Sequence, residues 1–237
     1  MHTNDWSDFT ADIAWFVKAT DTIVVSDAQP AVPALFKPTE QFKSAFPILT
    51  ALLGQARITT VNINHNEYHL YGWTDQEGKS LGWLCKAPGF KGIYSASKVL
   101  HPLHATLLHC FGGIVERWNE LDTWLLHHNT VLTEEECEVG FNGAEDYYQM
   151  MCEDEGIAAT LNPEDYVAFA FEANGNCTIY HKNDAEILMF AHDHSFAHIS
   201  PLMGCPEYTL YTINGCPDFS TWVETVASQW RAHILSS

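Results

Sequence analysis

The segment YVAFAFEANGNCTIYHKNDAEILMFA, residues 166–191, carries the strongest indication of the fold. It contains three short apolar runs, 166–173, 177–181 and 186–191, separated by two polar turns. The first turn holds Asn174-Gly175, and Asn-Gly between apolar runs is the strongest short-range signal for a β-hairpin. We therefore predict three neighbouring antiparallel strands.

These strands have apolar residues on both faces, as in Ile179-Tyr180 and 188–190. A strand that is buried on both sides needs cover on both sides, so we expect helices on each face of the sheet. The last of these helices is predicted to follow Asp218, a good N-cap residue, because Phe219, Trp222 and later apolar residues recur at helical spacing.

Outward from this segment, the rest of the chain alternates helical and strand patterns. We predict helices over 7–19, 40–53 (kinked or split at Pro47), 102–111 and 145–155, and a helix starting at Thr133. We also predict a hairpin of 57–64 with 68–73, and strands over 81–84 and 208–213. Gly112-Gly113 reads as the left-handed C-cap of the helix 102–111. The economical fold is a single α+β domain over residues 1–237, with a mostly antiparallel sheet packed by helices.

Charge is distributed very unevenly along the 237 residues. Lys and Arg number 11 against 30 Asp and Glu, a formal net charge of −19. Through Lys98 there are 8 basic and 9 acidic residues, whereas the remainder has 3 basic and 21 acidic ones. Nucleic-acid binding requires cationic side chains and is not expected. The C-terminal part instead would attract a basic partner, although acidity for solubility alone is the alternative.

Residues 134–155 form the densest acidic segment and contain no Lys or Arg. Acids in the first turn of a helix stabilise its dipole, which accounts for those at 134–136, but acids near a helix C-terminus such as 153–155 are unfavourable. An acidic patch that is present although it destabilises the end of a helix indicates a basic partner. We predict that the partner-binding residues are Glu134, Glu135, Glu138, Glu145, Asp146, Glu153, Asp154 and Glu155.

The main alternative is a zinc-dependent hydrolase that uses His192, His194 and His198. His192 and His194 would share one face of a strand, but no His-Glu-x-x-His motif accompanies them, and exposed loop histidines are the simpler interpretation. His101 and His104 are a weaker pair. Nucleophile and phosphate-binding motifs are also missing from the sequence, so we expect no catalytic residues, no metal, no cofactor and no enzymatic activity.

The seven cysteines contain no Cys-x-x-Cys spacing and are odd in number, so we expect reduced thiols rather than a disulfide framework. The acidic N-terminus lacks the basic start and apolar run of a secretory signal. The sequence also has no uninterrupted apolar stretch of about 18 residues, the length that a membrane span needs. A cytoplasmic protein that does not bind membranes is expected.

Three blocks, in order, resemble the SUKH superfamily. The first runs from His101-Pro102 to Phe111-Gly112-Gly113-Ile114 and on to Trp118-Asn119-Glu120 and Thr123-Trp124; the second holds 173–176 and 186–193; the third is 217–223. The resemblance covers residues 100–234, and residues 1–99 are expected to be an N-terminal elaboration of the same domain.

This resemblance implies a non-enzymatic immunity protein, because most bacterial SUKH proteins are thought to bind and block a cognate toxin, often a nuclease. Toxin contacts are not shared across the family, so no binding residue is carried over from it. The expected partner is a basic toxin domain that meets the acidic surface. A regulatory scaffold with a partner other than a toxin is a third possibility.

Overall fold

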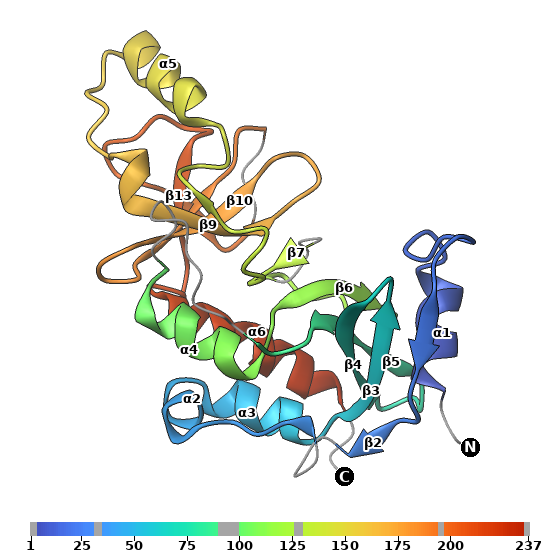
Figure 1. Cartoon of the computed structure of the whole chain (residues 1–237). Coiled ribbons are helices and arrows are strands. Elements are labelled where there is room, and N and C mark those ends of the chain that lie inside the picture. The colour runs from blue at the N-terminus through green and yellow to red at the C-terminus, as the bar shows by residue number, and fades with distance from the viewer. Residues whose placement is uncertain (1–3, 31–34, 90–99, 126–129, 194–196, 235–237) are drawn as a thin grey trace.

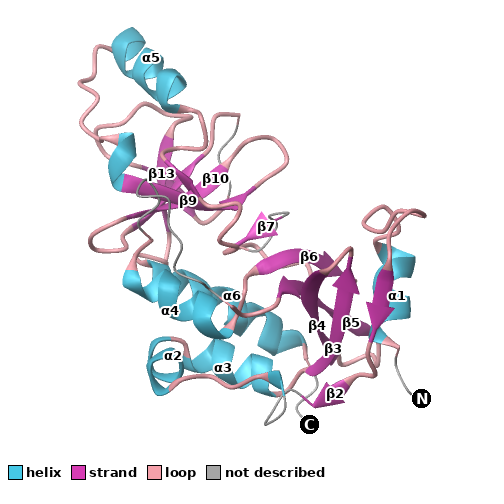
Figure 2. Ribbon diagram, in the orientation of Figure 1, coloured by secondary structure: helices cyan, strands magenta, loops and turns pink. Residues whose placement is uncertain are grey.

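The computed structural model describes residues 4–30, 35–89, 100–125, 130–193 and 197–234 (Figures 1 and 2). His194, which the sequence suggests as a zinc ligand, lies outside these ranges. The described helices are α1 (Asp5–Asp12), α2 (Glu40–Ala45), α3 (Pro47–Gly54), α4 (Pro102–Cys110), α5 (Glu145–Glu155) and α6 (Phe219–His233), with a short 3-10 helix η2 (Pro163–Asp165). The strands are β1 (Ile23–Val25), β2 (Gln29–Pro30), β3 (Arg57–Ile63), β4 (Asn66–Thr74), β5 (Ser80–Lys86), β6 (Ile114–Trp118), β7 (Thr130–Val131), β8 (Glu138–Val139), β9 (Tyr166–Phe171), β10 (Cys177–His181), β11 (Ile187–Phe190), β12 (Ile199–Pro201) and β13 (Leu210–Ile213).

The strands form one 13-stranded sheet in the order β1-β3-β4-β5-β6-β7-β9-β10-β11-β13-β12. Outside this order, β2 pairs with β3, and β8 pairs with β9. The pairings between these strands are antiparallel, from the long hairpin of β3 and β4 to the β9–β10–β11 meander. The predicted α+β class with a mostly antiparallel sheet is therefore confirmed.

Helices cover both faces of the sheet, as the two-sided apolar strands predicted (Figure 2). On one face, α2, α3, α4 and α6 share a large core with the strands, and Tyr180 belongs to it. On the other face, α1 covers β3–β6 through Phe9, and α5 covers β9–β11 through Tyr148. Ile179, the neighbour of Tyr180 on β10, belongs to the α5 cluster. Successive residues of β10 thus point into different cores, which is the two-residue alternation of a strand.

Helix α6 connects the two halves of the sheet through aromatic contacts. Asp218 caps it, as predicted, by accepting the Thr221 N–H at 2.8 Å. Near its start, the Trp222 ring lies 5.0 Å from that of Phe169 on β9. Near its end, Trp230 lies 4.9 Å from Trp83 on β5. One amphipathic helix therefore buries aromatic rings against both a first group of strands, β1–β6, and a second group, β7–β13.

Gly112-Gly113 lies where the two groups of strands meet. Helix α4 ends with Phe111 in an extended conformation, so the predicted left-handed cap directly after the helix is wrong. Gly113 is left-handed, with φ +84°, but it begins the path into β6. A side chain at Gly113 would collide with the backbone of Leu132 and Thr133, 2.6 Å away. The glycines are needed because three backbone segments pass close together here.

Two predicted helices differ from the structure near the N-terminus. The helix predicted over 7–19 is shorter, because α1 spans Asp5–Asp12 and turns replace it from residue 13. Phe16 still packs on Phe9, with ring centroids 5.6 Å apart. The helix predicted over 40–53 is divided at Phe46 and Pro47 into α2 and α3, as the proline indicated.

Candidate functional site

Helix α5 carries the largest group of predicted binding residues and has the predicted bounds. In Figure 1 it lies at the opposite end of the molecule from α1 and the N-terminus. Its inner face buries Tyr148 and Cys152 in a core with Phe141. Gly156 ends the helix in the left-handed conformation, φ +67°, which is a common C-terminal cap.

The outer surface of α5 is acidic at both ends. Asp146 in the first turn and Glu153, Asp154 and Glu155 in the last turn are exposed, and the last turn has no basic residue. The last three lie at the C-terminal end of the helix, where the dipole disfavours negative charge, as the sequence indicated. Glu145 has a different role, since its half-buried carboxylate accepts the Phe141 N–H at 2.6 Å and shapes the entry to the helix.

The acids at 134–138 are not on a helix, so the helix predicted to start at Thr133 is wrong. Residues 134–136 form a turn, and Glu138 lies on β8 opposite Ala168. The Leu132 N–H donates to the carbonyl of Phe169 at 2.7 Å. The backbone on both sides of the turn therefore pairs with β9, and this pairing overrides the local helix signal.

These acids contribute unequally to an open acidic surface. Glu135 forms an ion pair with Lys86, with Oε1 and Nζ 3.4 Å apart. Glu134 is half-buried, whereas Glu138 is exposed. The structure thus separates Glu134 and Glu135, in the turn before β8, from the exposed acids of α5.

A second acidic group, which was not predicted from the sequence, surrounds Tyr166 at the start of β9. Burial, together with the nearby carboxylates of Glu186, Asp184 and Asp165, raises the pKa of Tyr166 to about 12. Those three carboxylates are exposed. They come from η2 and from the turn between β10 and β11, so no run of acids in the sequence marks them.

A third group of carboxylates comes together around Cys177, between β8 and α5. Burial raises the pKa of its thiol, and the carboxylates of Glu145, Glu172 and Glu138 add to the effect. Between Arg117 and Arg231 the sequence has one basic residue, Lys182. The Lys182 ammonium donates to the carbonyl of Glu164 at 2.6 Å.

Exposed apolar side chains accompany the acids at this end of the molecule. Met150, on the outer face of α5, is 48% exposed, and Met203, in the turn after β12, is 95% exposed. That turn packs against α5, because the Cys205 thiol lies 3.9 Å from the Tyr148 hydroxyl. Methionines are flexible apolar groups that adapt to a partner surface.

The described histidines do not assemble a zinc site. His192 is exposed and stacks on Phe190, with ring centroids 6.1 Å apart. His198 is exposed and lies against Trp124 at 4.5 Å. Within the described ranges, no three His, Cys, Asp or Glu side chains are placed to hold a metal ion together.

His101 and His104 have different structural roles and do not form a common site. The His101 imidazole accepts the Leu103 N–H and caps α4. His104 is fully buried, 2.9 Å from the Leu132 carbonyl and 3.2 Å from the Tyr180 hydroxyl. Both imidazoles therefore have structural partners.

All seven cysteines are free thiols, and six of them are buried. Burial raises the pKa of the Cys85 thiol well above its usual value, and it does the same for Cys177. A nucleophilic cysteine needs a lowered pKa, so neither of these two thiols is activated.

None of the helices in the described residues is both long enough and apolar enough to cross a bilayer. Comparison of the chain with protein-family models, curated proteins and solved structures finds no match. The resemblance to the SUKH superfamily therefore stays a prediction from the sequence.

Proposed function

We propose that the protein is a cytoplasmic immunity protein that binds a cognate toxin and neutralises it without chemistry of its own. The partner is a basic toxin domain, of the nuclease type. The binding surface is the exposed part of α5, where Glu153, Asp154 and Glu155 meet solvent beside Met150.

One observation carries this proposal: exposed carboxylates gather at α5 and around Tyr166, in a part of the sequence with 21 acidic and 3 basic residues. Such a field attracts a cationic protein and raises the rate of encounter. Exposed methionines beside the charges would add apolar contact once the partner has docked. The SUKH resemblance, which implies immunity, points in the same direction.

The direct test is binding to the toxin domain encoded beside this protein. We expect isothermal titration calorimetry to show a stoichiometric complex, and the toxin activity to fall as the complex forms. A catalytically dead toxin variant should bind equally well, because the proposed contact does not depend on turnover. If no neighbouring toxin domain binds, the proposal is wrong, and a regulatory scaffold with another partner takes its place.

A further inference from the structure

A cavity of about 520 Å³ lies at the opposite end of the molecule from α5, beside the start of α1. Asn4, Asp5 and Trp6 form one wall, and the connection between β1 and β2 forms another with Ser26 and Asp27. Thr59 on β3 lies between them. The cavity is large enough for a small organic molecule.

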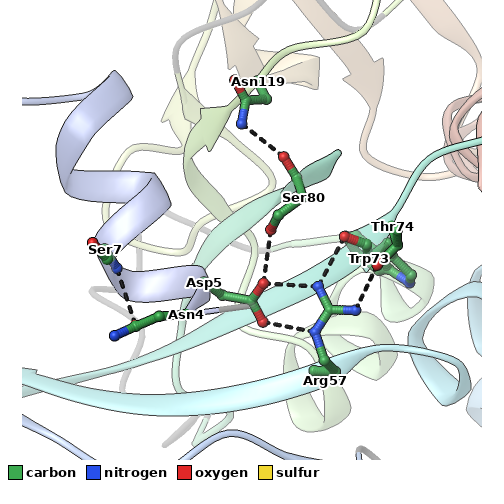
Figure 3. A network of polar contacts seen from close by, with 8 residues as sticks. All are labelled: Asn4, Asp5, Ser7, Arg57, Trp73, Thr74, Ser80 and Asn119. Atoms are coloured by element: carbon green, nitrogen blue, oxygen red, sulfur yellow. Dashed lines mark hydrogen bonds and ion pairs between the residues drawn. The ribbon is translucent and has the colours of Figure 1, made fainter. Parts of the chain in front are cut away.

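Behind the cavity wall, the carboxylate of Asp5 is rigidly held in a network of polar contacts (Figure 3). Asp5 is 1% exposed and accepts hydrogen bonds from Arg57 Nε at 2.9 Å, from Arg57 Nη2 at 2.7 Å and from Ser80 Oγ at 2.7 Å. Arg57 also donates to the Thr74 hydroxyl and to the Trp73 carbonyl. The Asp5 side chain is fully buried and packs against Gly72 of β4, so its carboxylate, whose charge Arg57 balances, supports the wall and is closed to a ligand.

The outer carboxylate belongs to Asp27, which is exposed. Within the described ranges, no Lys, Arg or His forms an ion pair with it. Because the Asp5–Arg57 pair is balanced, Asp27 gives the cavity a net negative charge. An ammonium or guanidinium group in the cavity would therefore not compete with a cation of the described residues for Asp27.

The wall that α1 forms includes an aromatic side chain, Trp6. The indole of Trp6 stacks on Phe9, with ring centroids 5.5 Å apart and an angle of 20° between the planes. Trp6 is half-buried and lines the cavity. An aromatic face next to a carboxylate is a good environment for an ammonium or guanidinium group, because both attract positive charge. An anionic ligand would be repelled by Asp27.

We infer that this cavity binds an organic cation, an ammonium or guanidinium group on an aliphatic chain. Asp27 is its counterion, and Trp6 packs on the aliphatic chain. The cation is either a free amine or a Lys or Arg side chain of another protein. The site is independent of the toxin-binding surface on α5.

The test is calorimetric titration of the full chain with agmatine, which carries both cationic groups on a four-carbon chain. We expect binding by the wild type, and chemical-shift changes at the amides of Ser26, Asp27 and Thr59 in an NMR titration. Asp27→Asn should weaken binding by about tenfold or more, the cost of losing a charge-assisted contact. Asp8→Asn makes the same charge change on α1 outside the cavity and should leave the affinity unchanged.

Two further ligands complete the experiment. 1,4-Butanediol has a similar chain without charge and should not bind. An acetylated arginine amide mimics a protein side chain: tighter binding than agmatine assigns the site to a partner protein, and weaker binding assigns it to a free amine. No agmatine binding at millimolar concentration, equal binding of the diol, or equal effects of Asp27→Asn and Asp8→Asn would each overturn the inference.

Discussion

The imidazole of His104 lies in the core between α4 and the sheet, with a partner at each ring nitrogen. A carbonyl only accepts hydrogen bonds, so Nε2 carries the proton and donates to Leu132 at 2.9 Å. Nδ1 then accepts from the Tyr180 hydroxyl at 3.2 Å. Burial is the main reason that the pKa of His104 is lowered to about 4.

This shift predicts a pH dependence of stability. The unfolded chain protonates His104 near its ordinary pKa of 6.5, whereas the folded protein does so at about 4. The neutral imidazole therefore stabilises the folded protein fully above pH 6.5. This stabilisation is lost as the pH falls to about 4, and the free energy of unfolding decreases by about 3 kcal/mol in total. His104→Gln keeps a donor for Leu132 and does not titrate. In denaturant unfolding, the free energy of unfolding of the wild type should fall relative to that of this variant as the pH is lowered. A difference between the two proteins that does not change with pH would contradict a lowered pKa of His104.

Gly72 on β4 provides the room for the carboxylate of Asp5. A Cβ at position 72 would meet the carboxylate oxygens and Cγ of Asp5 closer than any real Cβ contact. Gly72→Ala should therefore displace Asp5 from Arg57, and breaking a buried pair costs about 3–5 kcal/mol. Urea unfolding measures the loss. Gly89→Ala is the control, because nothing lies within 4 Å of its Cβ. Equal stabilities of the two variants would show that the space at Gly72 is not needed.

Elements with strong local signals were predictable from the sequence. The strand 177–181 follows Asn174-Gly175 and has the predicted bounds, as does the helix 145–155. The hairpin of β3 and β4 also follows the prediction, with Asn64 and His65 in left-handed conformations at its turn. In each case the turn residues and the apolar periodicity agree with the tertiary structure.

Elements that depend on distant pairing were not predictable. The strands β7 and β8 have two residues each, too few for any periodicity to appear. The helix predicted to start at Thr133 does not form, because the segment pairs with β9, a contact that the local sequence does not encode. For the same reason, the acids around Tyr166 were missed, since they meet only after η2 and the β10–β11 turn come together.

The junction at Gly113 gives a prediction for the connection between the two groups of strands. Gly113→Ala would strain a φ of +84° and also collide with Leu132 and Thr133. Gly204 has a φ of +86° with nothing within 4 Å, so Gly204→Ala carries the strain alone. We expect about 1 kcal/mol of destabilisation at Gly204 and clearly more, about 3 kcal/mol, at Gly113 in thermal or urea unfolding. Equal losses would mean that the close backbone approach is unimportant.

Across the whole molecule, the change from balanced to strongly acidic sequence coincides with the change from the first to the second group of strands. The first group of strands belongs to a part of the sequence with nearly balanced charge, and α5, η2 and the β10–β11 turn belong to the strongly acidic part. Helix α6 joins both parts through Trp222 and Trp230, so the acidic end is presented from a continuous core. Long-range attraction acts before contact and is weakened by salt.

The most direct measurement is the association rate with the toxin domain, followed by stopped flow over a range of salt concentrations. Reversing Glu153, Asp154 and Glu155 to Lys should slow association about tenfold or more at low salt and flatten its salt dependence. Reversing Glu40, Glu67 and Glu77 changes the net charge equally in the first part of the chain, where all three are exposed. We predict a much smaller effect for this control. An unchanged rate for the α5 variant, or equal slowing by both variants, would contradict a binding surface on α5.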